Sequence, residues 1–246
     1  MRYFIYMSDA NIDQIKKKTR GLLTGYSTRG PKREQAYHQL RRLLILQQIP
    51  QGTRMAESKW TYRLGVNRSA LREAFARLEA EGLIELGPKN GYFVPSLKVN
   101  DIQEILALRF ALEGSAIEII CQSGLNTPQH LKPLQETCEL LEWLVVEEYE
   151  LSTVEADYRF HEELIRATGN KRLTIAYRHA PLLILHPDTT SGPQWAKRVR
   201  RTLDEHRAIL KAIFEGNVHN ARELLRSHLT GNKEHVKHAS LDNVKG

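Results

Sequence analysis

Between residues 34 and 94, the chain runs through an order of short patterns that only a few folds accommodate. Apolar residues recur at three- and four-residue intervals in three separate stretches, which is typical of amphipathic helices. A tight turn separates the second stretch from the third, and two short β-prone runs joined by Gly, Pro and Asn follow. We therefore expect helices at residues 34–47, 57–64 and 68–81 and hairpin strands at 83–86 and 92–94. Helix, helix, tight turn, helix and hairpin is the order of a winged helix-turn-helix.

The third predicted helix has the two faces that reading DNA requires. Its apolar stripe consists of Leu71, Ala74, Phe75 and Leu78. Arg68, Ser69 and Arg72 lie off that stripe in the first turn and a half, and Asn67 is a suitable N-cap. A recognition helix enters the major groove with its N-terminal turns. There, arginine binds guanine, and Asn67 or Ser69 binds a phosphate or a base edge.

The predicted hairpin and the charge of this region point to the same kind of partner. Lys89 and Asn90 lie in the turn, from which they would reach the flanking DNA backbone or minor groove. Residues 14–98 contain seventeen Lys and Arg against six acidic residues, an excess that indicates a polyanionic partner. Charge alone fits a solvated basic surface equally well, and the helices alone fit an ordinary three-helix core. The complete ordered set of elements favours DNA binding over both.

The rest of the chain is predicted to be an all-helical bundle, joined to this unit by a linker at residues 95–99. Helical patterns extend over 101–123, 128–148, 153–168, 171–185, 195–215 and 218–237, with no strand pattern among them. The expected fold is mainly α, with an N-terminal arm at 1–30, a winged helix-turn-helix at 31–95 and the bundle at 100–238. We assign no function to the arm or to the polar segment 186–193.

The compartment is predicted from features that are missing. The sequence has no run of 18 apolar residues, so we expect no membrane span. Its first residues lack the basic flank and long apolar stretch of a signal peptide. The two cysteines, Cys121 and Cys138, are not spaced for a metal clip, and we expect buried thiols rather than a disulfide. A cytoplasmic protein is therefore predicted.

Three helices of the predicted bundle each place a histidine on an inward, apolar side. Asp157 and His161 are four residues apart and so project from one helix face, while His206 and His228 lie on two later helices. A divalent metal bound by one carboxylate and three imidazoles satisfies all four groups at once. From the residues alone, four separately satisfied core residues are an equal alternative. We assign no ligand role to His38, His130, His179, His186, His219, His235 and His238.

Two blocks of the chain resemble known families, and together they span about residues 34–235. The first is similar to the winged-helix domain of GntR-family repressors, in GTRMAE at 52–57, LGVNRSALREA at 64–74, LEAEGLI at 78–84 and NGYFV at 90–94. The second resembles the FCD ligand-binding domain of FadR-type regulators, in RFALE at 109–113, Asp157 to Asn170, and Glu205 to His228.

The first resemblance implies that Arg68 and Arg72 contact operator bases. Many GntR members carry an arginine where this chain has Ser58, so that contact is absent here, and Lys59 or Arg63 replaces it only in part. A symmetric homodimer placing two recognition helices on an inverted-repeat operator is expected. The chain is then a ligand-responsive transcriptional regulator, and specifically a repressor.

The FCD resemblance implies a metal ion of the Zn, Ni or Mn class, bound by Asp157, His161, His206 and His228. A small organic acid would lie beside the metal, with Arg109 as its charge partner. Arg109 has an alternative role, because Glu113 is four residues away and can form a structural ion pair with it.

Three other classes of protein could carry some of these features. A metal-dependent hydrolase is disfavoured because Ile165 stands where the second histidine of a zinc-protease HExxH motif belongs. An architectural DNA-binding protein has no need for a helical domain with inward polar groups. A metal sensor, in which the ion itself is the signal, stays open.

Overall fold

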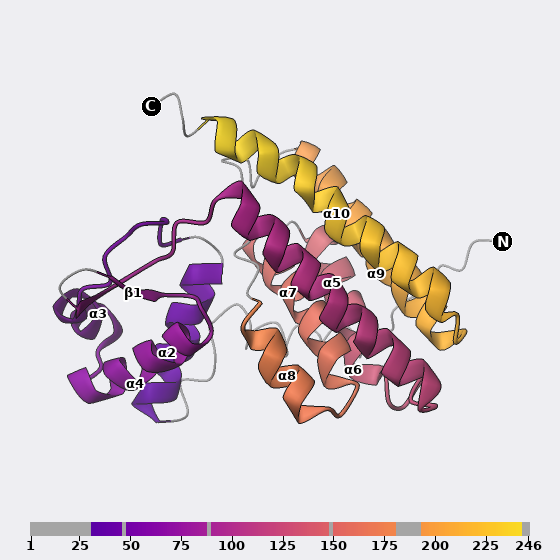
Figure 1. Cartoon of the computed structure of the whole chain (residues 1–246), viewed down its shortest axis with the longest axis horizontal. Helices are drawn as coiled ribbons and strands as arrows, with labels where there is room; N and C mark the ends of the chain where they lie inside the picture. The colour runs from indigo at the N-terminus through magenta and orange to yellow at the C-terminus, as the bar shows by residue number, and fades with distance from the viewer. Residues whose placement is uncertain (1–30, 46–47, 88–89, 148–149, 181–192, 243–246) are drawn as a thin grey trace.

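The computed structural model describes residues 31–45, 48–87, 90–147, 150–180 and 193–242. Figure 1 shows a smaller N-terminal unit beside a larger helical one. The smaller unit contains α2 (Lys32–Ile45), α3 (Glu57–Leu64), α4 (Arg68–Ala80), β1 (Glu85–Gly87) and β2 (Gly91–Phe93). The larger contains α5 (Val99–Gln122), α6 (Lys132–Val146), α7 (Glu150–Arg166), α8 (Lys171–Arg178), α9 (Pro193–Phe214) and α10 (Val218–Asp242). The mainly α fold with one small hairpin is confirmed.

The N-terminal unit is built around the apolar stripe of α4. Leu71, Phe75 and Leu78 are fully buried and pack with Leu40 and Leu44 of α2. The strands form a two-stranded antiparallel sheet that begins two residues later than predicted. The reason is that the residues at 83 and 84 are buried in this core, ahead of the sheet pairing.

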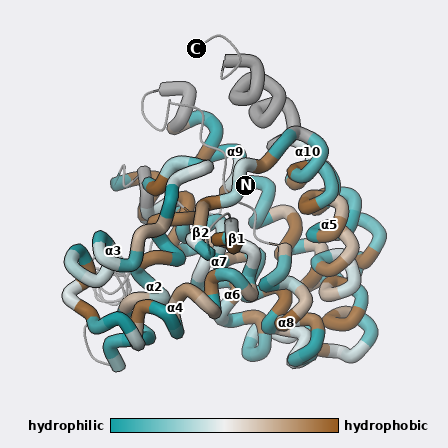
Figure 2. The backbone as a smooth tube through the Cα atoms, turned by 60° about the vertical axis from the view of Figure 1, so that its left-hand side comes forward, coloured by the Kyte–Doolittle hydropathy of each residue, from teal (hydrophilic) through white to brown (hydrophobic). Residues whose placement is uncertain are grey.

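The larger unit is a helical bundle with its own hydrophobic core. The core draws on α5, α7, α9 and α10, through residues that include Ile117, Phe160, Leu164, Ile209 and Leu225. Figure 2 shows hydrophobic and hydrophilic residues alternating along these helices, as amphipathic helices require. Within the part of this unit that the structure describes there is no strand, as predicted.

Several predicted helix ends differ from those observed, including the start of α7 at Glu150 rather than 153 and the end of α10 at Asp242 rather than 237, and a proline accounts for two other differences. The helix expected from residue 128 begins at Lys132, because Pro133 fits the first turn of a helix, where no N–H is needed. The helix expected to reach residue 185 ends at Arg178, and Pro181 explains the stop, since proline disfavours helix in the residue before it. The predicted arm at 1–30 and the segment 186–193, apart from the start of α9 at Pro193, lie outside the described residues.

The described helices and the two cysteines agree with the sequence expectations. Among the described helices, none is both long enough and apolar enough to cross a bilayer. Cys121 and Cys138 are free thiols, with Cys138 buried in the bundle core and Cys121 half-buried. Burial raises the pKa of the Cys138 thiol to about 12, so it is protonated and unreactive at neutral pH.

Candidate metal centre and recognition helix

Three helices bring four donor groups of the bundle together. Asp157 and His161 project from successive turns of α7, His206 comes from α9 and His228 from α10. One ligand atom from each lies within 4.8 Å of the others, and all three imidazoles are buried. The arrangement unites the four residues that the sequence singled out. Within the described part of the chain, no other cluster of this kind is found.

Two carboxylates outside the cluster orient two of its imidazoles. Nδ1 of His161 lies 2.7 Å from Oε2 of Glu113, and Nδ1 of His228 lies 2.8 Å from Oε2 of Glu205. Because an ionised carboxylate only accepts hydrogen bonds, each Nδ1 carries the hydrogen and donates it. With Nδ1 of each ring donating outward, Nε2 is the nitrogen that faces the cluster, and the Nε2 atoms of His161 and His228 lie 3.0 Å apart. A metal ion or a single shared proton between these two nitrogens would stabilise that approach.

His206 completes the donor set. Its Nε2 atom lies 3.2 Å from Oδ1 of Asp157 and 3.3 Å from Nε2 of His228. Its Nδ1 atom is buried without a hydrogen-bond partner among the described residues, and its ring stacks on Phe160. Burial lowers the pKa of His206 to about 4 and also lowers the pKa of His161, so both rings are neutral at pH 7.

The donor set therefore fits a divalent metal of the first transition series. Neutral imidazoles with one carboxylate suit Zn and Ni, and the carboxylate widens the choice toward Mn. Carboxylates that hold the far nitrogen of a ligating histidine are the usual outer support of such sites. Glu113 and Glu205 occupy that position here, although the sequence reasoning gave neither a metal-supporting role. The sequence did hold a signal for each of them, because Glu113 follows Arg109 by four residues and Glu205 directly precedes His206.

Arg109 is buried next to this centre and forms the structural pair that the sequence left open. Its Nε donates to Oε1 of Glu113 at 2.9 Å, and the Tyr177 hydroxyl donates to the same oxygen at 2.8 Å. Burial raises the pKa of Glu113, but His161 and Arg109 outweigh burial and lower it to about 2, so this carboxylate is ionised. Nη2 of Arg109 is buried without a hydrogen-bond partner among the described residues. One donor of the guanidinium is thus left for another acceptor.

The remaining histidines lie away from the cluster. His130, His179 and His219 are exposed, and His38 is half-buried on α2, so none of these four is a core residue. The side chains of His186, His235 and His238 lie outside the described residues.

On α4, the predicted DNA-contacting residues have different environments. Oδ1 of Asn67 accepts from the Ala70 N–H at 2.8 Å, the expected N-cap bond. Arg68 and Ser69 are exposed, and Arg68 makes no hydrogen bond or ion pair with the described residues. Arg72 is two-thirds exposed, and its Nε donates to Glu57 of α3 at 2.8 Å. Neither arginine packs against the protein in a way that blocks access to a duplex.

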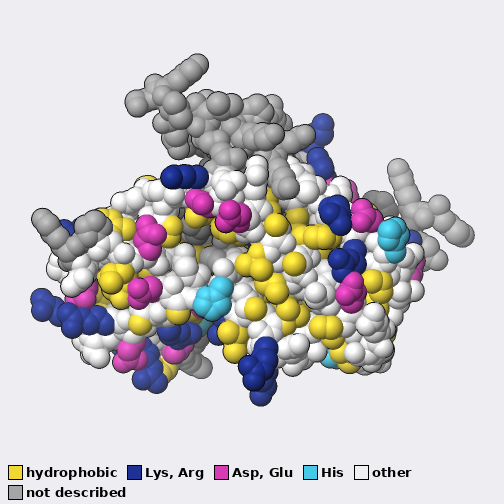
Figure 3. Space-filling view, viewed as in Figure 1, with side chains coloured by type: hydrophobic (Ala, Val, Ile, Leu, Met, Phe, Trp, Pro, Cys, Tyr) yellow, Lys and Arg dark blue, Asp and Glu magenta, His cyan; other side chains and the backbone are white. Residues whose placement is uncertain are grey.

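The wing is only partly described. Asn90 is exposed with a positive φ of 54°, a conformation that asparagine tolerates better than most residues. Lys89 lies outside the described residues. On the face seen in Figure 3, many Lys and Arg side chains lie beside acidic ones. Net charge is therefore a weaker guide to the DNA-binding surface than the exposed first turn of α4.

Comparison with known proteins agrees with both parts of the chain. Residues 104–231 match the FCD domain, and residues 32–94 match the family described as bacterial regulatory proteins, gntR family. The uncharacterised HTH-type regulator YdhC of Bacillus subtilis is 28% identical over 207 residues, covering 83% of this chain and 90% of YdhC. An HTH-type regulator from the ttuE-ttuC' intergenic region of Agrobacterium vitis is 32% identical over 131 residues, covering 53% of this chain and 77% of the relative.

A solved structure supports the fold independently. Escherichia coli McbR/YncC superposes with a TM-score of 0.69 at 18% identity, covering 87% of this chain and 99% of that protein. The families and relatives are transcriptional regulators, which confirms the regulator prediction over the hydrolase.

Proposed function

This chain belongs to the gntR family of bacterial regulatory proteins and is a transcriptional regulator with an FCD domain, and from that premise we propose that it is a homodimeric repressor controlled by a small carboxylate. The carboxylate binds beside a metal ion in the helical domain. The observation that carries this proposal is the convergence of Asp157, His161, His206 and His228 within 4.8 Å, with two imidazoles oriented from outside by carboxylates.

The DNA-binding part of the proposal rests on the start of α4. Arg68 and Arg72 contact bases, with Asn67 and Ser69 at a phosphate or a base edge and with Asn90 and Lys89 on the flanking backbone. Arg68 is exposed and has no partner among the described residues, which supports its role, because the guanidinium can then donate to both O6 and N7 of a guanine. Arg72 is two-thirds exposed although it is paired with Glu57, and this carboxylate of α3 orients its guanidinium.

The domain division follows the same logic. We assign DNA binding to residues 31–95 and effector binding to residues 100–238, with residues 95–99 as the connection. A two-fold dimer then places two copies of α4 on an inverted repeat. Free thiols at Cys121 and Cys138 are consistent with a cytoplasmic location.

The metal and Arg109 form the effector site. Asp157, His161, His206 and His228 would hold the ion, and Glu113 and Glu205 would keep two of the rings in the ligating tautomer. When bound, a Zn, Ni or Mn ion supplies a Lewis acid with coordination positions open to an oxygen ligand. Arg109 contributes the buried Nη2 donor as charge partner of an organic acid, while its Nε stays paired with Glu113.

Metal content tests the first step. The purified chain is stripped with EDTA, reloaded separately with Zn²⁺, Ni²⁺ or Mn²⁺, and measured by elemental analysis and native mass spectrometry. We expect one ion per wild-type chain and none in His206→Ala, with His219→Ala as the matched exposed control. Equal metal content in wild type and His206→Ala would refute the site.

DNA affinity tests the second step. A duplex selected by the wild-type chain from a random-sequence pool is titrated with metal-loaded protein, with and without a panel of small mono- and dicarboxylates. A carboxylate that changes DNA affinity in the loaded protein, but not in the Arg109→Gln variant, supports the proposal. DNA affinity that follows metal concentration alone, with no response to any carboxylate, would instead identify a metal sensor.

A further inference from the structure

Helix α7 carries two different sets of contacts on its two sides. One side presents Asp157 and His161 to the candidate metal centre. Their immediate neighbours, Tyr158 and Glu162, contact the N-terminal unit instead. Successive residues on a helix point about 100° apart, so the same two turns of α7 serve both sites.

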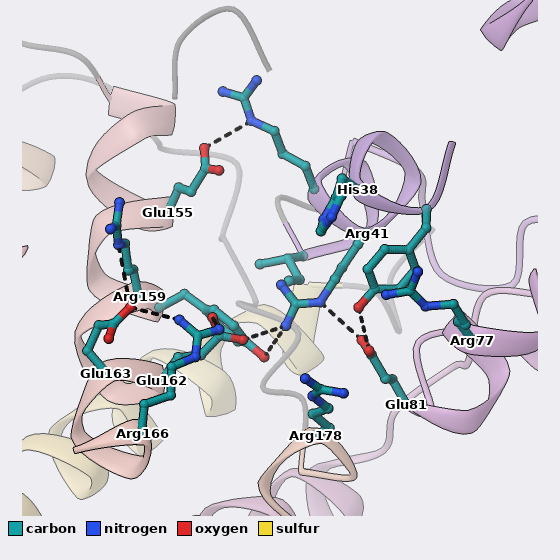
Figure 4. Close-up of a pocket in the computed structure, with 14 residues that line it drawn as sticks. His38, Arg41, Arg77, Glu81, Glu155, Arg159, Glu162, Glu163, Arg166 and Arg178 are labelled. Atoms are coloured by element: carbon teal, nitrogen blue, oxygen red, sulfur yellow. Dashed lines mark hydrogen bonds and ion pairs between the residues drawn. The ribbon is translucent and has the colours of Figure 1, made fainter. Parts of the chain in front are cut away.

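Tyr158 and Glu162 both contact Arg41 of α2. Its Nη2 atom lies 2.8 Å from Oε1 of Glu162 and 3.0 Å from the Tyr158 hydroxyl, and the guanidinium also lies over the Tyr158 ring. Its Nε donates to Oε2 of Glu81 at 3.0 Å. The side chain is only 12% exposed, so these are shielded interactions rather than surface ion pairs. Figure 4 shows Arg41 between Glu162 on one side and Glu81 on the other.

Glu81 connects this network to the recognition helix. It is the C-cap of α4, the same helix that begins at Arg68, and the Tyr37 hydroxyl donates to its other carboxylate oxygen. Arg41 thus joins α7, through Glu162, to the end of α4, through Glu81, so few contacts separate the candidate metal centre from the recognition helix. A second ion pair, between Arg42 and Glu155, also joins α2 to α7.

Apart from these contacts, the boundary between the N-terminal unit and α7 is polar and is not tightly packed. A cleft of about 370 Å³ lies there, and most of its lining is charged. Among the described side chains of α7, Tyr158 alone joins the hydrophobic core of the N-terminal unit. Polar boundaries of this kind allow domains to move relative to each other, so a few strong contacts determine their orientation.

We infer that Arg41 couples the metal centre to the DNA-binding unit, by fixing the orientation of α2 and α4 to the position of α7. The inference rests on the proposed function, because it assumes that the state of the metal centre moves α7. If α7 moves away, the shielded Nη2 of Arg41 loses its hydrogen bonds to both Tyr158 and Glu162 at once, and a buried donor without an acceptor is costly, so intermediate positions are disfavoured. The network then favours two discrete arrangements over a gradual shift, which is what a switch requires.

The test measures how strongly Zn²⁺ and DNA binding depend on each other. DNA affinity for the selected duplex is measured in Zn²⁺-loaded and EDTA-treated protein, and the ratio of the two dissociation constants is the coupling. Ratios of about 5 to 150 are usual for allosteric pairs, and we expect the wild type to fall there. In Arg41→Ala, the ratio should fall to within about twofold of unity, while Zn²⁺ affinity stays at the wild-type value.

A second variant guards against loss of folding in Arg41→Ala. The double variant Tyr158→Phe, Glu162→Gln weakens only the α7 contacts and leaves the Arg41–Glu81 pair intact, so the N-terminal unit keeps its support. It should lower the coupling in the same way. Arg159→Ala is the matched control, because Arg159 lies on the same helix and forms its ion pair with Glu163, which is also on α7.

The outcomes separate this inference from the proposed function. A wild type that binds none of Zn²⁺, Ni²⁺ and Mn²⁺ overturns the proposed function. A wild type that binds Zn²⁺ and DNA with a ratio near unity overturns the inference alone. The inference also falls if the double variant, folded by circular dichroism, keeps the wild-type ratio.

Discussion

At the scale of single residues, the proposed reading of DNA depends most directly on Arg68. Its neighbour Arg72 is already engaged by Glu57, whereas Arg68 has no partner among the described residues. We expect Arg68→Ala to weaken binding to the selected duplex by about 1–3 kcal/mol and to relax base preference at one position of each half-site. Fluorescence anisotropy against single-base variants of the duplex measures both effects.

The control for this prediction removes the same charge elsewhere. Lys171→Ala lies at the exposed start of α8 in the helical domain and should leave sequence preference unchanged. Unaltered discrimination among the duplexes in Arg68→Ala would remove this arginine from the base-reading set.

Glu205 would act on the proposed metal indirectly, because it contacts His228. Replacing it with glutamine keeps the shape and one acceptor but removes the charge that strengthens the imidazole as a ligand. We expect Glu205→Gln to lower Zn²⁺ affinity about 10- to 100-fold, the usual effect of losing an outer carboxylate. Asp204→Asn, at the exposed neighbouring position, should bind Zn²⁺ like the wild type. Competition with a chromophoric chelator measures both, and equal affinities would show that Glu205 only packs there.

Protonation of His206 predicts how metal-free protein responds to acid. Its pKa is lowered from 6.5 to about 4 by burial, so between these values the unfolded chain binds a proton that the folded chain does not. The free energy of unfolding should therefore fall as pH falls through this window, by up to about 3 kcal/mol from this group. Urea titrations in EDTA from pH 7 to pH 4 measure it. The dependence of the free energy of unfolding on pH should be weaker in His206→Gln and unchanged in His219→Gln. The same dependence in the wild type and both variants would contradict the lowered pKa of His206.

At the scale of whole elements, the N-terminus of α4 illustrates what local sequence predicts well. Asn67 caps the helix through the Ala70 N–H, three residues on. Asn67→Ala removes that acceptor and should destabilise the DNA-binding domain by about 0.5–2 kcal/mol, with Asn67→Asp restoring most of the loss. Hydrogen exchange of the amides in the first turn of α4 reports this locally. Protection that is unchanged in Asn67→Ala would mean that packing alone holds the helix start.

Predictions succeeded where neighbouring residues determine the structure. The start of α4 follows from Asn67, and the inward faces of α7, α9 and α10 follow from helical periodicity, which placed His161, His206 and His228 correctly. Pro133 and Pro181 are local signals for the start of α6 and the end of α8, two positions that periodicity alone misplaced. Pairings between distant positions were not predictable, because periodicity gives a face of a helix but not its neighbour. Glu205 with His228 and Arg41 with Glu162 are of that kind.

At the scale of the whole molecule, the proposed dimer makes the arrangement of its two recognition helices the property that determines operator binding. A two-fold dimer engages both half-sites of an inverted repeat only if their spacing matches the separation of the two α4 helices. Linked binding of this kind gains about 10²- to 10⁴-fold over one half-site and is lost when geometry forbids simultaneous contact.

Changing the spacing of the half-sites therefore tests the dimer without altering the protein. Inserting about five base pairs rotates one half-site by about half a turn, which places it on the opposite face of the duplex. We expect affinity to drop to that of a duplex with a single half-site. Inserting about ten base pairs restores the face but not the distance, so recovery should be partial. Sedimentation of the protein–DNA complex gives the stoichiometry in each case. Affinity that is indifferent to spacing, with one chain bound per half-site independently, would mean that the regulator reads DNA as a monomer.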